Sequence, residues 1–146
     1  MPVYDRFAAT AMVARPAGYL LPPQHHHLVE LLRAQGVVVA RLDASWRGEV
    51  EGFTVDSLEV AAFVFEGHRT VNVTGHWSPR EAELNAGWYY VSTDQRLGVF
   101  AGYVLEPGSE DGYATWNYLD RDLRPKQEAP ILRVRQALRV PMVLVE

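Results

Sequence analysis

Hydrophobic residues follow two different periods in the first third of the chain. The apolar run at residues 17–21 predicts a short strand, and Pro23 suits the first turn of a following helix because proline lacks the N–H that would go unpaired there. Gly36 is typical of a helix end. A second strand is predicted at 37–42. The helix would present Leu28, Leu31 and Leu32 on one apolar face. Strand, helix and strand within 17–42 predict a βαβ unit with a right-handed crossover.

The middle of the chain has the period of two that is typical of strands. Strands are predicted at 50–55, 58–65, 70–77 and 88–93, with a bulge at Gly52. The third is the clearest, because Val71, Val73 and Trp77 point one way and polar residues alternate with them. We expect Val71 and Val73 to be buried and Pro79 to end the strand.

The last third mixes a helical pattern with a strongly apolar tail. Apolar residues recur at helical spacing over 96–106, and Pro107 would stop that helix. Residues 108–112 predict a turn, and 140–145 predict a buried strand. The fold class is therefore α/β, with α+β as the alternative: a small mixed sheet with one or two helices. We expect one domain over 1–146, in which 1–15 form an entering arm and 16–146 a β-rich body.

Composition removes several classes of function. The 146 residues include no cysteine, which excludes disulfides, thiol catalysis and cysteine-based zinc sites. The net charge is −4 with both signs interspersed, so no basic stripe suggests a nucleic-acid partner. No apolar run is long enough to span a bilayer, and residues 1–6 do not read as a signal peptide. The compartment stays open, because a secreted or periplasmic parent protein could carry a leader that this chain lacks.

The histidines near the start of the first helix offer a candidate metal site. His27 and Glu30 have the His-x-x-Glu spacing that places two ligands on one helical face. A catalytic zinc requires three protein ligands and an open position, and the only later histidines are His68 and His76. We therefore interpret residues 25–27 as a solvated first helical turn and expect no metal site. His68 and His76 are interpreted as ordinary structural residues.

Acidic and aromatic residues supply the remaining candidates. Five carboxylates gather late in the chain: Glu106, Glu110, Asp111, Asp120 and Asp122. The turn at 110–112 could offer oxygen ligands to calcium, but it lacks the EF-hand pattern, and a solvated turn is the simpler interpretation. The tryptophans could line a sugar- or peptide-binding face or belong to the core. They are Trp46, Trp77, Trp88 and Trp116.

Several segments together carry a family resemblance. They are residues 2–7, 15–22, 31–37, 65–75, Leu105-Glu106-Pro107, 109–112 and Trp116-Asn117. Over nearly the whole chain they resemble the C-terminal domain that follows the catalytic domain in bacterial carboxypeptidase A-like zinc metallopeptidases. None of these segments is a catalytic motif. The resemblance implies a non-catalytic accessory domain, with the zinc and the active site in a catalytic domain that this chain lacks.

The resemblance also implies partners. They would be the peptidase domain of the same parent protein and a peptide or glycan substrate, and the arm at 2–13 could support a weak homodimer. Two other functions remain open from the residues: a stand-alone carbohydrate- or peptide-binding module that uses exposed tryptophans, and a metal hydrolase built on residues 25–30.

Overall fold

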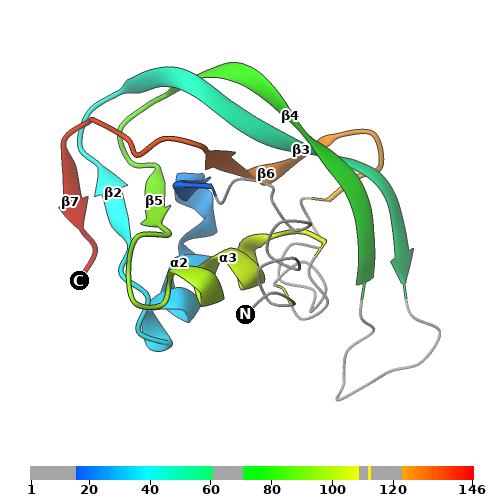
Figure 1. The fold of residues 1–146 in the computed structure, drawn as a ribbon, viewed down its shortest axis with the longest axis horizontal. Coiled ribbons are helices and arrows are strands. Elements are labelled where there is room, and N and C mark those ends of the chain that lie inside the picture. Colours follow the sequence, from blue (N-terminus) through cyan, green and yellow to red (C-terminus); the bar gives the residue numbers. More distant parts are fainter. Residues whose placement is uncertain (1–15, 61–70, 109–111, 113–122) are drawn as a thin grey trace, which may run out of the picture.

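A seven-stranded sheet and two α-helices form the part of the chain that the computed structural model describes, residues 16–60, 71–108, 112 and 123–146 (Figure 1). The entering arm, most of the turn at 108–112, and residues 61–70 lie outside it. The strands are β1 (Gly18–Leu21), β2 (Ala40–Leu42), β3 (Trp46–Val60), β4 (Val71–Leu84), β5 (Tyr89–Ser92), β6 (Glu128–Val134) and β7 (Met142–Leu144). The helices are the 3₁₀-helix η1 (Pro23–His25) and the α-helices α2 (His26–Ala34) and α3 (Gly98–Leu105). Neither α-helix is long and apolar enough to cross a membrane.

The sheet runs β4-β3-β6-β1-β5-β2-β7, and each described ladder is antiparallel. The expected α and β composition is confirmed. Because β1 and β2 both pair antiparallel with β5, they run parallel to each other with β5 between them. The helix between β1 and β2 therefore connects two parallel strands that are separated by a third strand.

The first helix forms for the reasons that its sequence predicts. Leu28 and Leu32 are fully buried, and Leu31 packs against the same core. Gly36 has a φ of 97°, and its N–H donates to Arg33 O while the next N–H donates to Leu32 O. These bonds satisfy carbonyls at the helix end. One expectation is wrong: His25 is 3% exposed, so only the other two histidines of 25–27 are solvated.

The single strand β3 includes the strand predicted at 50–55 and the start of the strand predicted at 58–65. A register shift between Val55 and Ser57, in the ladder with β4, marks a bulge in it. A further shift follows Gly52 in the ladder with β6. Its partner β4 continues through Pro79, which was expected to end it. Strand β4 is the outermost of the sheet, so a missing N–H can be tolerated on its free edge.

The strand β6 is central to the sheet, yet it was not predicted. It lies between β3 and β1 and contributes Ile131 and Leu132 to opposite faces. Pro130 and two arginines at its end hide the strand pattern in the sequence. The register jumps from Gly52↔Leu132 to Thr54↔Glu128, so β6 carries the extra residues where its proline sits. The tail was expected to be a buried strand, but β7 is a short edge strand with Leu144 64% exposed.

Two apolar clusters lie on opposite faces of the sheet. The first packs α2 and α3 against the sheet through residues such as Tyr19, Leu32 and Val104. Val71 and Val73 belong to it, which confirms their predicted burial. The second cluster, as far as the described residues form it, contains no helical residue. It forms because β3 and β4 curve over the other strands as a long arch (Figure 1).

Candidate functional site

The residues that suggested metal binding lie apart from any larger ligand group. His27 and Glu30 are exposed on α2, and His76 is exposed on β4 with its Nδ1 3.3 Å from Asp56 Oδ1. Among the described residues, no group of three or more His, Asp or Glu side chains is arranged to hold a metal ion. His68 and the acidic residues Glu110, Asp111, Asp120 and Asp122 lie outside the described residues.

The tryptophans serve different parts of the fold. Trp77 packs on the helix-side cluster and meets Phe53 edge-on, with 5.2 Å between ring centroids. Trp88 packs on the opposite cluster. Trp46 packs at the border of that same cluster and also lines a pocket. All three are half-buried, and Trp116 lies outside the described residues.

A polar network is enclosed between α3 and the sheet, with Glu106 at its centre. Tyr19 Oη donates to Glu106 Oε2 at 2.6 Å, and Trp77 Nε1 donates to Oε1 at 3.0 Å. Arg133 Nη1 lies 3.2 Å from Oε2, and its guanidinium carbon lies 4.1 Å from the centroid of the Trp77 ring. Three elements of the sheet and the end of α3 therefore meet at one carboxylate.

The same arginine extends the network to a second carboxylate. Arg133 Nε donates to Glu51 Oε1 at 2.7 Å, and both side chains are only 10% exposed. The more exposed Arg135 approaches Glu51 Oε2 at 3.2 Å. Two arginines thus balance two glutamates. Buried charges persist when they are paired and hydrogen-bonded in this way, so we assign the network a structural role.

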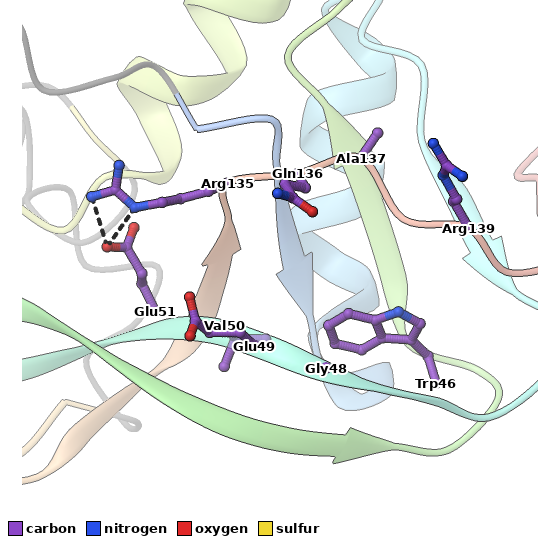
Figure 2. A pocket seen from close by; sticks show the side chains of 9 residues that line it. All are labelled: Trp46, Gly48, Glu49, Val50, Glu51, Arg135, Gln136, Ala137 and Arg139. Carbon is purple, nitrogen blue, oxygen red and sulfur yellow. Dashed lines mark hydrogen bonds and ion pairs between the residues drawn. The ribbon is translucent and has the colours of Figure 1, made fainter.

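A pocket of about 490 Å³ opens next to this network, in the size range of about 300–1,000 Å³ that is common for ligand sites. One wall is the first part of β3, and the other is the segment that leaves the end of β6 (Figure 2). The lining residues are Trp46, Gly48, Glu49, Val50, Glu51, Arg135, Gln136, Ala137 and Arg139. We call this pocket the notch.

The notch lies on the edge of β3, rather than on one face of the sheet. Consecutive side chains of a strand point to opposite faces, so a pocket on a face would be lined by every second residue. Here four consecutive residues, 48–51, line the pocket. On this edge β6 pairs with β3 at Glu51 and Gly52 but with none of the residues 46–50. The notch is therefore the place where β3 continues beyond the end of its neighbour.

The alternation along β3 identifies which backbone groups face the notch. Val55 N–H donates to Gln127 O at 3.0 Å, and Lys126 N–H donates to Val55 O at 2.6 Å, so Val55 points its backbone toward the β6 side. The register with β4 is unbroken from Trp46 to Val55. Every second residue back along the strand faces the same side, so the N–H and C=O groups of Arg47 and Glu49 face the open edge.

The charges around the notch differ in their pairing. Arg135 spans toward Glu51 at the closed end of the notch (Figure 2), with its side chain 51% exposed. Arg139 lies on the same wall as Arg135, at the end of the notch where Trp46 stands on the β3 wall (Figure 2), and no acidic partner for it is present in the described part of the chain. Glu49 is exposed on the opposite wall. The notch thus presents a guanidinium, an indole ring and backbone groups together.

Among the described residues, Arg80 and Tyr90 have raised pKa values, and both lie away from the notch. Hydrogen bonding to Glu128 raises the pKa of Arg80, which spans from β4 to β6 on the sheet surface with Arg80 Nη2 2.6 Å from Glu128 Oε1. Burial raises the pKa of the Tyr90 hydroxyl, which points toward Ala17 O at 3.4 Å. Neither group is suited to proton transfer near neutral pH, because both shifts move the pKa further above 7.

Sequence reasoning missed the charged residues of both sites. Glu51, Arg133 and Arg135 were not singled out, and Glu106 was noted only in an acidic group and in the Leu105-Glu106-Pro107 segment of the family resemblance. One signal was present: Arg133 interrupts an apolar run from Ile131 to Val134, and a charge inside a buried strand needs a partner.

Comparisons with known proteins relate the chain to part of a larger protein. It is 32% identical over 121 residues to Carboxypeptidase 2 of Trichophyton tonsurans, which covers 83% of this chain and 22% of that protein. Carboxypeptidase 2 of Trichophyton equinum is 31% identical over 122 residues, with 84% and 22% covered. Probable carboxypeptidase 2 of Arthroderma benhamiae is 34% identical over 98 residues, with 67% and 19% covered.

The other comparisons add no family or fold name. No family model matches the chain, and no solved structure matches it. The relatives are fungal, so the restriction of the resemblance to bacterial enzymes is not supported. The chain spans about a fifth of the length of the curated relatives it matches, and it is a carboxypeptidase-related domain.

Proposed function

We propose that this chain is a non-catalytic accessory domain of a zinc carboxypeptidase, which stabilises the peptidase domain or contributes to substrate binding. The observation that carries the proposal is how much of each protein takes part in the match. The match covers 83% of this chain but only 22% of a protein named Carboxypeptidase 2. A match of that form is what a separate domain of a longer enzyme produces. The zinc and the reacting groups then belong to the remainder of such an enzyme.

The outer face of α3 is our candidate for contact with the peptidase domain. Val99 is 67% exposed and Tyr103 is 45% exposed, and residues four apart lie on the same side of a helix. Contacts between domains of one chain bury roughly 600–1,500 Å², and aromatic residues often anchor such contacts. An exposed valine and tyrosine on one helical face suit this role.

Activity and metal content of the isolated chain give the first test. We expect no release of C-terminal amino acids from peptide substrates, with or without added zinc, and less than one equivalent of zinc retained after dialysis. A catalytic zinc needs three protein ligands and an open position, whereas His27 and Glu30 supply two. One bound zinc, together with activity that His27→Ala abolishes, would contradict the proposal.

A second test uses the relative. The segment of Trichophyton tonsurans Carboxypeptidase 2 that matches this chain would be deleted, and peptidase activity and heat inactivation would be followed. We expect a raised KM or faster inactivation. With this chain placed in the relative in the position of the deleted segment, charged substitutions at Val99 and Val143 give a matched pair, because Val143 is 44% exposed but lies on β7, away from α3. Only the substitution on α3 should reproduce the effect of the deletion.

A further inference from the structure

We propose that the notch binds an extended peptide segment, which adds a strand to the open edge of β3 and places an acidic side chain against Arg139. The proposal goes beyond the accessory role and does not depend on it, because it rests on the edge itself. Strand addition gives affinity through main-chain hydrogen bonds and specificity through the pockets between them.

The length and position of the edge suit a short extended segment. Residues 46–50 at about 3.3 Å per residue expose roughly 16 Å of edge. A peptide in the notch would continue the line of β6 beyond its end and pair with Arg47 and Glu49, whose backbone groups face that side. The pocket of about 490 Å³ lies between β3 and the segment that follows the end of β6, where that segment turns away from β3.

Other edges of this sheet are protected, whereas this one is not. The outer edge of β4 carries Pro79 opposite Glu51, and the alternation along β3 directs that proline's backbone away from β3. The opposite edge is β7, a strand of three residues. Proline and short length are two ways in which proteins block edge pairing. Residues 46–50 contain no proline, so the edge in the notch retains its donors.

Charge decides the chemistry of the occupant. Arg133 and Arg135 share Glu51, and Arg133 also meets Glu106, so that group is balanced. Arg139 is then the cation that the described part of the notch leaves for a ligand; Glu49 lines the opposite wall, so the acidic side chain of the peptide is placed at the Arg139 end of the notch. A guanidinium accepts a carboxylate through two parallel hydrogen bonds. Trp46 lies on the opposite wall at the same end of the notch (Figure 2) and offers apolar contact to a neighbouring side chain of the peptide.

The test measures binding to this chain with three synthetic peptides. The first is acetyl-Ser-Val-Thr-Glu-Thr-Val-Ser-amide, the second replaces its glutamate with lysine, and the third carries N-methyl groups on alternate residues. We expect the first to bind and to slow amide hydrogen exchange at Arg47 and Glu49. The N-methylated peptide should bind at least about tenfold more weakly, because several main-chain hydrogen bonds to the strand are lost.

Matched variants locate the two interactions. Glu49→Pro removes an N–H that faces the notch, whereas Glu49→Ala keeps it, so only the proline should weaken binding. Arg139→Gln should abolish the preference for the glutamate peptide over the lysine peptide. Near-UV circular dichroism checks that each variant is folded. If the proline variant does not fold, the N-methylated peptide still tests strand addition on the unchanged protein.

Several outcomes would overturn the proposal. They are equal binding of the parent and N-methylated peptides, unchanged exchange at Arg47 and Glu49 with peptide bound, and no binding of any of these peptides at millimolar concentration. Chitohexaose bound next to Trp46 without peptide binding would assign the notch to a glycan. A concentration-dependent dimer that excludes the peptide would assign the edge to a second copy of the chain. The peptidase experiments above have separate readouts, so failure of one proposal is distinguishable from failure of the other.

Discussion

The two sides of Glu51 on β3 give the clearest contrast in the molecule. From Glu51 to Val55 the strand is flanked by β4 and β6, and Glu51 itself is buried in a charged network with Arg133. Before Glu51 the strand keeps β4 but pairs with no described strand on the other edge, and the notch opens there. The same strand is therefore enclosed on both edges over residues 51–55, called the closed half below, and has an open edge over residues 46–50, called the open half.

The contrast shows how the end of one strand creates a site on another. Strand β6 ends at Val134, and the chain turns away at Arg135 toward β7. Arg133, near the end of β6, is buried in the network, and Arg135 is half-exposed at the closed end of the notch. Removing one partner of a buried polar pair in the closed half lowers the free energy of unfolding, because the other partner stays buried without a hydrogen bond. Polar groups in the open half can bond to water instead. Substitutions should therefore affect folding on one side and binding on the other.

The largest expected effect comes from removing the central cation of the closed half. Arg133→Met leaves Glu51 and Glu106 without their shared partner, and breaking a buried pair costs about 3–5 kcal/mol. Urea unfolding followed by tryptophan fluorescence measures the loss. The control is Arg139→Met in the open half, which should change the free energy of unfolding by no more than about 0.5 kcal/mol. Similar losses for both variants would remove the distinction between the two halves.

The next effect tests one hydrogen bond of the network. Tyr19→Phe removes the hydroxyl that donates to Glu106 at 2.6 Å, and hydrogen bonds to charged groups contribute about 1.5–3 kcal/mol. Tyr89 is a matched control, because it packs against the same apolar cluster from the adjacent strand β5. Tyr89→Phe should cost less than Tyr19→Phe in thermal unfolding. The reverse order would mean that the Glu106 network does not hold α3 to the sheet.

Alkaline pH gives a smaller effect, on the face of the sheet away from the helices. Burial raises the pKa of Tyr90 above its ordinary value of 10.0, so the folded state favours the neutral hydroxyl. The stability that this contributes is complete below pH 10 and falls as the pH rises through the folded pKa. The slope is at most about 1.4 kcal/mol per pH unit for one proton. Tyr90→Phe should flatten the profile above pH 10, and an unchanged profile would contradict the assignment.

The sequence predicted the elements whose pattern is local, and it missed those that depend on distant pairing. Strand β1, helix α2 and the buried face of β4 follow from short-range periods. Strand β6 is buried on both faces, carries Pro130 and has no alternation to reveal it. The notch depends on where β6 ends against β3, and Glu51 and Arg133 are 82 residues apart. No local pattern encodes that register, so the open edge becomes visible only in the folded sheet.

The smallest expected effect concerns the open half itself. Glu49 and Glu81 lie directly opposite each other in the β3–β4 ladder, and both are exposed. Like charges in that position are destabilising, and opposite charges contribute roughly 0.2–1 kcal/mol. Glu49→Lys should therefore stabilise the fold slightly in dilute buffer, and 1 M salt should remove most of the gain because the pair is solvated. The double variant Glu49→Lys with Glu81→Lys restores a like-charge pair and should lose the gain. Destabilisation of the single variant at both salt concentrations would mean that Glu49 has a structural partner. Residues 46–50 of β3 would then not form an open edge.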